Sequence, residues 1–168
     1  MVCFRLLKNR GASAGKGDLN GIADHREGGE AIYYSYDHRS RLTAEDWVDA
    51  GGGSIYAYEY AYDGAGNRTR KSLGASHTYY QYDETNRLTK SHRVPAGAAT
   101  YYSYDPRGNT TQIEQLGAHT TYFQYNDRDL VESIHYGDTG TWNYFHYDAR
   151  GLRYAMRDSS GLRYFTWD

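Results

Sequence analysis

The sequence predicts an all-β fold of repeated antiparallel β-hairpins that form one long curled sheet. A Tyr-Asp pair, or a close equivalent, recurs along most of the 168 residues at spacings of 20 to 26. Each pair is flanked by short stretches in which large and polar side chains alternate, as they do in half-buried strands. No stretch shows a sustained helical period. Self-similarity at this period indicates a repeat architecture, so helix should be negligible.

The clearest unit is the stretch from Tyr60 to Lys71. Tyr60 and Tyr62 share one face of a strand because successive side chains point to opposite faces. Asp63 opens a tight turn and Gly66 closes it, where a hairpin loop of this length needs a residue with positive φ. The carboxylate of Asp63 can accept hydrogen bonds from backbone N–H groups inside the turn. The chain after the turn then forms the partner strand.

The same unit recurs at Tyr36-Asp37, Tyr62-Asp63, Tyr82-Asp83, Tyr104-Asp105, Tyr125-Asn126, Tyr147-Asp148 and Trp167-Asp168. The third residue after the acidic position is Gly, Asn or Asp in five of six units, and these types tolerate positive φ. We predict positive φ at Gly66, Gly108 and Gly151. The predicted turn positions are Asp37, Asp63, Gly66, Asp83, Asn86, Asp105, Gly108, Asn126, Asp148 and Gly151.

Gly-rich and polar return turns alternate with the Tyr-Asp turns. They are predicted at Asp49 to Ser54, Leu73 to Ser76, Pro95 to Ala98, Leu116 to His119, Gly137 to Gly140 and Asp158 to Gly161. Two short strands and two turns account for the period, giving about thirteen strands. Strict alternation places Leu152, Tyr154 and Met156 on one face, and Arg153, Ala155 and Arg157 on the other.

The chain divides into residues 1–30, predicted to be irregular or poorly ordered, and residues 31–168, predicted to hold about seven repeats with the last one truncated. The first segment is rich in glycine and poor in large apolar residues in its second half. An alternative is that this segment is a degenerate repeat that has lost its aromatic residues.

The composition suits a wide sheet with one wet face. Leu, Ile, Val and Phe make up only about 14% of the chain, but there are 20 tyrosines, whose rings bury apolar area while the hydroxyls stay polar. With a net charge of −2, the chain as a whole has no electrostatic attraction to nucleic acid or to an anionic membrane. Arginines that follow the turns could bind single-stranded nucleic acid, but acidic residues are equally frequent, so no nucleic-acid partner is expected.

No residue pattern predicts catalysis. The seven histidines have no metal-ligand spacing, and the repeated aspartates are assigned to turns. Cys3 is the only cysteine, so no intrachain disulfide can form, and a stray thiol is favoured over a reactive one. We therefore expect no enzyme, no catalytic residue, no metal site and no cofactor. The short apolar start is neither a signal peptide nor a membrane span.

The tyrosines of the outgoing strands should form a structural ladder across the sheet. An alternative is an aromatic platform for sugar. The predicted ladder comprises Tyr34, Tyr36, Tyr60, Tyr62, Tyr80, Tyr82, Tyr102, Tyr104, Phe123, Tyr125, Phe145 and Tyr147.

The motif Tyr-x-Tyr-Asp-x-x-Gly-Asn/Arg-Leu/Arg-Thr resembles the YD repeat (Rhs repeat) of bacterial Rhs proteins, insecticidal toxin-complex shells and teneurins. YAYDGAGNRTRK and YQYDETNRLTKS carry the resemblance most fully, and YSYDPRGNTT and FHYDARGLRYAM are close. It covers roughly residues 33–168, with Ser40, Asn126 and Trp167 as departures. The resemblance implies part of a YD-repeat shell, on a secreted or cell-surface protein.

The resemblance implies a non-catalytic scaffold that encloses or presents a polypeptide cargo and adjoins remaining shell segments. The alternative is a cell-surface adhesion module that binds carbohydrate with its tyrosines. The family's closing Asp-Pro-x-Gly and Asn-Pro motifs are absent, so we expect a fragment or truncated gene product. An open sheet would leave edges at the strand of Ile32 and at the C-terminal strand, which predicts edge-to-edge self-association.

Overall fold

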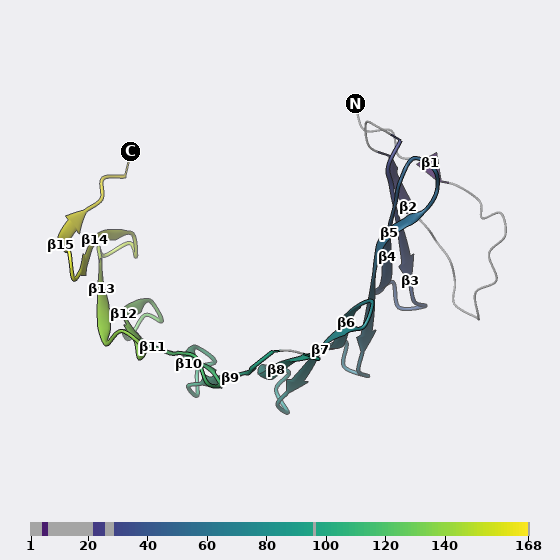
Figure 1. The fold of residues 1–168 in the computed structure, drawn as a ribbon. Coiled ribbons are helices and arrows are strands. Elements are labelled where there is room, and N and C mark those ends of the chain that lie inside the picture. Colours follow the sequence, from purple (N-terminus) through teal and green to yellow (C-terminus); the bar gives the residue numbers. More distant parts are fainter. Residues whose placement is uncertain (1–4, 7–21, 26–28, 96, 168) are drawn as a thin grey trace. The chain divides into compact units, whose positions relative to one another are not determined.

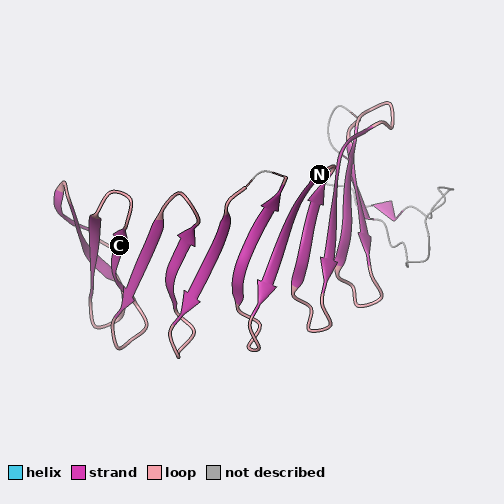
Figure 2. Ribbon diagram, turned by 60° about the horizontal axis from the view of Figure 1, so that its bottom comes forward, coloured by secondary structure: helices cyan, strands magenta, loops and turns pink. Residues whose placement is uncertain are grey.

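The structure is a computed structural model that describes residues 5–6, 22–25, 29–95 and 97–167. The described residues form fifteen strands, all antiparallel to the neighbours with which their pairing is described, and no helix (Figures 1 and 2). The strands are β1 (Arg5–Leu6), β2 (Ile22–His25), β3 (Ala31–Tyr36), β4 (Leu42–Val48), β5 (Ser54–Tyr62), β6 (Arg68–Leu73), β7 (Ser76–Tyr82), β8 (Leu88–Val94), β9 (Ala99–Tyr104), β10 (Thr110–Gln115), β11 (Thr120–Tyr125), β12 (Val131–Tyr136), β13 (Thr141–Tyr147), β14 (Arg153–Asp158) and β15 (Gly161–Tyr164).

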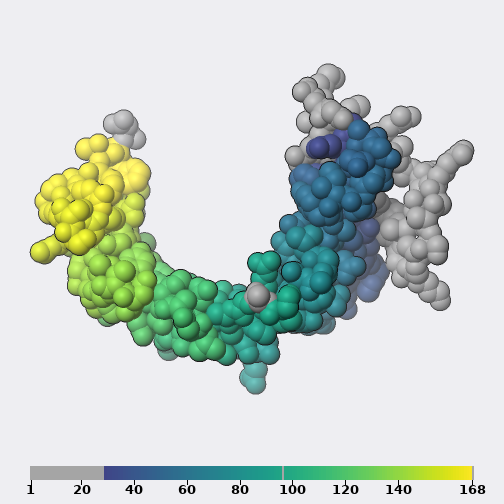
Figure 3. Space-filling view, viewed as in Figure 1, coloured from purple at the N-terminus to yellow at the C-terminus, as the bar shows by residue number. Residues whose placement is uncertain are grey.

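The strand order in the sheet follows the chain order, as expected for a run of hairpins. The predicted all-β class of repeated antiparallel hairpins is confirmed, and thirteen of the strands, β3 to β15, follow Ala31. The return turns occupy the predicted places between strands. The chain separates into two compact units, Met1–Tyr80 with Arg93–Ala96, and Gln81–His92 with Gly97–Asp168. In the space-filling view, segments that follow one another in the sequence lie next to one another within each unit (Figure 3).

Most of residues 1–30, including Cys3, lies outside the described residues, so the prediction of an irregular N-terminal segment remains a proposal. The parts of it that are described include β1 and β2. β2 pairs with β3, with Ile22 opposite Tyr34 and Asp24 opposite Ile32. The expectation that the Ile32 strand forms a sheet edge is therefore wrong, because β3 has β2 on one side and β4 on the other.

Each Tyr-Asp hairpin whose strand pairing is described contains a register shift just after its turn. In the β5–β6 hairpin, Tyr62 pairs with Arg68 but Ala61 pairs with Arg70, so Thr69 is an extra residue. The same shift occurs in the β3–β4, β9–β10, β11–β12 and β13–β14 hairpins. One extra residue in one strand is a β-bulge, and it interrupts the alternation of side chains.

The bulge corrects the predicted faces of β14. Arg153 pairs with Tyr147 and Met156 pairs with Phe145, and the two β13 residues share a face. Arg153 and Met156 therefore lie on the same face, although strict alternation placed them on opposite faces. The guanidinium of Arg153 lies 5.4 Å from the ring centre of Phe145, in agreement with this assignment.

The core is thin. Its buried apolar residues are mostly small or β-branched, and they are Ala31, Ile32, Val48, Ala99, Phe145 and Ala155. Among the described residues two serines are also buried, and each has a polar partner on the neighbouring strand: Ser72 with His77 at 2.9 Å, and Ser133 with Gln124 at 2.9 Å. With so little aliphatic burial, we expect the contacts at the turns and between repeats to carry much of the stabilisation.

Candidate functional site

The repeated unit is built around the aspartate that opens each turn. In the turn at Asp105, carboxylate Oδ1 accepts the backbone N–H groups of Arg107 and Asn109, both at 2.9 Å. Oδ2 accepts the side-chain amide of Asn109 at 3.0 Å. The backbone closes the same loop, because the N–H of Gly108 donates to the carbonyl of Asp105 at 3.0 Å. The side chain and the carbonyl of Asp105 thus together satisfy the inner N–H groups of the turn.

The other turns repeat this arrangement. The carboxylates of Asp37, Asp83 and Asp148 each accept the N–H groups of the second and fourth residues that follow them. At Asp63 the N–H groups come from the third and fourth residues. Asn126 does the same with its amide oxygen, at 2.9 Å to Arg128 and 3.2 Å to Leu130. An amide is sufficient because only the oxygen is needed.

The bonds inside the turns keep these carboxylates ionised. The backbone N–H of Arg41, followed by its guanidinium, lowers the pKa of Asp37 to about 2 against a desolvation that raises it. The amide of Asn67 lowers the pKa of Asp63, and that of Asn109 lowers the pKa of Asp105. Backbone N–H groups lower the pKa values of Asp83 and Asp148. A group that must stay ionised to hold its turn is a poor proton donor at neutral pH.

The third residue after each acidic position has positive φ, which confirms the prediction made for the three glycines. The angle is 100° at Gly66, 94° at Gly108 and 85° at Gly151. The non-glycine residues at the same position, Ser40, Asn86 and Asp129, have φ of 59°, 64° and 59°.

A second feature joins one repeat to the next. The hydroxyl of each of four YD tyrosines donates to the backbone carbonyl of the fifth residue after the preceding acidic position. The pairs are Tyr62 to Leu42 at 2.7 Å, Tyr104 to Leu88 at 2.8 Å, Tyr125 to Thr110 at 2.9 Å and Tyr147 to Val131 at 2.8 Å. Trp167 fills the same role with its indole N–H, which donates to the carbonyl of Arg153 at 2.8 Å. We call these bonds the clasps.

Burial raises the pKa values of the clasp tyrosines Tyr104, Tyr125 and Tyr147. The neutral phenol is therefore kept as a donor, which is what a bond to a carbonyl requires. Because the acceptor is a backbone group, the side chain at the acceptor position can vary, and it is Leu, Thr, Val or Arg in the described clasps.

Arginines form a third link between repeats. Nη1 of Arg41 donates to the carbonyl of Asp63 at 2.9 Å, and Nη2 of Arg128 donates to the carbonyl of Asp148 at 2.9 Å. The Nε of Arg41 is meanwhile bound to its own turn aspartate at 2.7 Å. One guanidinium thus spans two consecutive turns. This role of the arginines was not predicted from the sequence.

The predicted ladder residues lie on a half-buried face, and Phe145 is the most buried of them. Cations cover the flat faces of several of their rings. Guanidinium carbons lie 4.8 Å from the ring centre of Tyr62, 4.8 Å from that of Tyr80 and 4.9 Å from that of Tyr104. Burial, followed by the charge of Glu45, raises the pKa of Tyr60 to about 12. These rings are engaged in internal contacts rather than presented to solvent.

A different set of aromatics lies on the opposite face of the second unit, where Tyr122, Trp142 and Tyr144 are exposed and His135 is half-buried. Tyr122, His135 and Trp142 are cross-strand neighbours on β11, β12 and β13. The ring centres are 5.7 Å apart for Tyr122 and His135, and 4.3 Å apart for His135 and Trp142. Tyr144 continues the row at 5.8 Å from Trp142. We call these four residues the exposed aromatic row. The row was not predicted from the sequence, although its residues alternate with those of the ladder.

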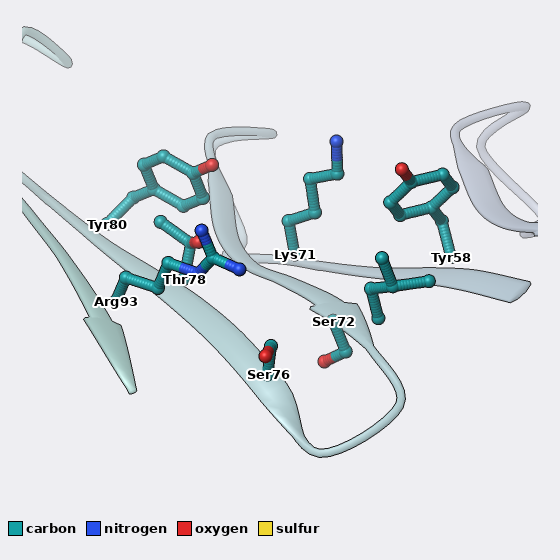
Figure 4. A pocket seen from close by; sticks show the side chains of 8 residues that line it. Tyr58, Lys71, Ser72, Ser76, Thr78, Tyr80 and Arg93 are labelled. Carbon is teal, nitrogen blue, oxygen red and sulfur yellow. The ribbon is translucent and has the colours of Figure 1, made fainter. Parts of the chain in front are cut away.

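One hollow of about 300 Å³ lies on the half-buried face of the first unit, over β5, β6, β7 and the end of β8 (Figure 4). It is lined by Tyr58, Lys71, Ser72, Leu73, Ser76, Thr78, Tyr80 and Arg93. Figure 4 shows Lys71 standing between the rings of Tyr58 and Tyr80. Of these residues, the sequence predicted a ladder position for Tyr80 and the ends of a return turn for Leu73 and Ser76, but no shared site.

Within residues 5–6, 22–25, 29–95 and 97–167, no cluster of three His, Cys, Asp or Glu side chains has a geometry that could hold a metal ion. A search of the same residues for a helix long and apolar enough to cross a membrane finds none.

No protein-family model and no curated protein sequence matches the chain. Solved structures do resemble it. The crystal structure of TcdB2-TccC3-TEV is similar over 84% of this chain with a TM-score of 0.67 at 18% identity, and that of TcdB2-TccC3-Cdc42 over 88% with a TM-score of 0.66 at 16% identity. The chain spans about 9% of the length of each. A third, the Photorhabdus luminescens Tc holotoxin pore with a TccC3 mutation, has a TM-score of 0.47 at 16% identity, covers 81% of this chain and 10% of that one, and adds nothing to the fold comparison. The first two likenesses establish a shared fold.

Proposed function

We propose that this chain is a segment of a YD-repeat shell, a non-catalytic scaffold that encloses or presents a polypeptide cargo. The observation that carries the proposal is the repeated clasp. In five described places, a donor from one repeat reaches the same backbone carbonyl of the repeat before it. Such links extend a sheet repeat by repeat, and they leave the identity of most side chains free.

The fold likeness to structures that contain TcdB2-TccC3 supports the proposal, since the sequence resembles toxin-complex shells in its repeat motif. The same resemblance supports two further parts of the proposal, which are association with further shell segments and a secreted or cell-surface location. The commitment of the turn aspartates to internal bonds supports a structural role rather than a catalytic one.

Protease protection tests the proposal on the full-length gene product that contains these residues. If the repeats enclose a polypeptide, part of the intact protein should survive digestion under native conditions and should be degraded after the shell is unfolded. Uniform digestion of the native protein would contradict enclosure. Capture of a cross-linked polypeptide on the outer surface alone would favour presentation over enclosure.

A second candidate, carbohydrate binding, is favoured by the exposed aromatic row. Trp142 and Tyr144 are 37% and 42% exposed, and aromatic side chains are common contacts for flat ligands. The half-buried ladder is a weaker candidate because cations already cover the faces of Tyr62, Tyr80 and Tyr104. A glycan array with the wild-type chain and Trp142→Ala separates the two functions. Saturable binding that Trp142→Ala abolishes would support the carbohydrate module.

A further inference from the structure

The hollow on the first unit combines two cations with hydroxyl groups. Lys71 and Arg93 come from β6 and β8, and Ser76 and Thr78 come from β7 between them. Thr78 is the cross-strand partner of Lys71, which places their side chains on the same face. Figure 4 shows Arg93 beside Thr78, and Lys71 between this pair and Tyr58. The hollow thus presents N–H and O–H donors from three strands.

The two cations have no acidic partner in the described part of the chain. Among the described residues, no carboxylate oxygen lies within 4.0 Å of a charged nitrogen of Lys71 or Arg93. The ammonium of Lys71 instead lies 4.2 Å from the ring centre of Tyr58. A cation held over a ring keeps its outward N–H groups available for an anion.

Neighbouring acidic groups are already engaged. Glu45, the cross-strand neighbour of Tyr58, accepts the indole N–H of Trp47 at 2.5 Å and the hydroxyl of Tyr60 at 3.4 Å. Glu59 lies on the opposite face, where it pairs with Arg70 at 3.7 Å. The hollow is therefore a positively charged site without an internal counter-ion.

The size of the hollow and the covered faces of its aromatic rings limit which class of ligand can bind. A carboxylate can accept charge-assisted hydrogen bonds from both cations and from the hydroxyls. A uronic acid would also need a free aromatic face for its ring, but Lys71 covers Tyr58 and the guanidinium of Arg68 lies 4.8 Å from the ring centre of Tyr80. A hollow of about 300 Å³ accepts one acidic side chain with its flanking backbone.

We propose that this hollow binds the carboxylate of an aspartate or glutamate side chain from a polypeptide, through Lys71, Arg93, Ser76 and Thr78. This inference deepens the scaffold function, on which it rests for the source of the polypeptide. The site itself is a property of the purified chain and is tested with short peptides. Absence of peptide binding would remove this site while leaving protease protection of a cargo unaffected.

The experiment titrates the purified chain with a hexaglutamate peptide at low salt and follows the backbone amide signals of residues 71–78 by NMR. A hexaglutamine peptide is the neutral control. The glutamate peptide should shift these signals and lose affinity as salt is raised, since exposed charges are screened. Equal shifts with the glutamine peptide would overturn the proposal. Glucuronate is the second arm, and a tighter affinity for it than for the peptide would assign the site to an acidic sugar instead.

Variants assign the binding to the hollow. Lys71→Gln and Arg93→Gln should each weaken peptide binding by about tenfold, the size expected for loss of one charge-assisted bond. Lys90→Gln is the matched control, because Lys90 lies 5.3 Å from the ring centre of Tyr101 in a similar cation–ring contact but does not line the hollow. If Lys90→Gln weakened binding as much as Lys71→Gln, the effect would be one of net charge and the assignment would be wrong. The exposed side chain of Arg93 keeps the test valid if Lys71→Gln fails to fold.

Discussion

Replacing Gly66 by alanine should destabilise the protein, whereas replacing Gly64 by alanine should not. Both glycines lie in the turn that Asp63 opens, and a Cβ atom added at either position would meet nothing within 4 Å. They differ in backbone conformation, because Gly66 has φ of 100° and Gly64 is outside the positive range. The pair therefore isolates the cost of the left-handed conformation from any steric contact.

The expected magnitudes follow from that difference. A residue with a Cβ atom in the left-handed region costs about 1–2 kcal/mol, so Gly66→Ala should lower the free energy of unfolding by that amount. Gly64→Ala should raise it by about 0.4–1 kcal/mol, because alanine reduces the entropy of the unfolded chain without strain. At about 2–4 °C per kcal/mol for a chain of this size, Gly66→Ala should melt about 2–8 °C lower than wild type.

Thermal denaturation followed by circular dichroism measures both effects. Gly66→Asn is a further control, since Asn86 occupies the same turn position with φ of 64°, and it should fall between wild type and Gly66→Ala. If the two alanine variants had the same melting temperature, the turn geometry would not depend on positive φ, and the assignment of the repeated turn would be wrong.

Three further predictions address the clasps, the turn carboxylates and metal content. Tyr125→Phe removes the hydrogen bond from the hydroxyl to the carbonyl of Thr110 and should lower the free energy of unfolding by about 1 kcal/mol. Tyr122→Phe, on the opposite and exposed face, should leave the melting temperature unchanged. Equal effects of the two substitutions would refute the clasp. Because the pKa of Asp37 is lowered to about 2 in the folded state and is about 3.9 in an unfolded chain, its contribution to stability is complete above the unfolded pKa and lost as pH falls toward the folded one. When melting temperature is measured from pH 7 to pH 2, it should therefore begin to decrease once the pH is below 4, and it should decrease less steeply in Asp37→Asn. An unchanged slope in that variant would contradict this account. Elemental analysis of protein purified without chelator should find no stoichiometric zinc or calcium, since the turn aspartates are bound internally.

The hairpins and their turns could be predicted from the sequence because they depend on local chemistry. An acidic residue, a residue that tolerates positive φ and a fixed separation between them are enough to define the loop, and the loop in turn sets the strand ends. The return turns followed from glycine, proline and polar residues at the opposite ends of the strands. These features need no knowledge of distant contacts.

The faces of the strands could not be predicted as well, because the bulge after each turn adds a residue without leaving a clear mark in the sequence. Thr69, for example, is not distinguished by type from the threonines of regular strand positions. One extra residue moves every later side chain to the other face, which is why Arg153 and Met156 were wrongly separated. The hollow over β5 to β8 was missed for a related reason, since it depends on which residues of four strands share a face.

The clasp explains how a sheet with so little aliphatic burial can hold its repeats in register. Each clasp and each turn carboxylate binds backbone groups, so its geometry is the same whichever side chain stands at the acceptor position. The substitution of an indole N–H at Trp167 for a phenol hydroxyl keeps the donor and therefore keeps the link. Stability should then be set mainly by nearest-neighbour terms between consecutive hairpins, as in other repeat proteins. Loss of one clasp in Tyr125→Phe should accordingly speed amide hydrogen exchange in β9 to β12 more than in β13 to β15, and a uniform increase along the chain would argue for a single cooperative core instead.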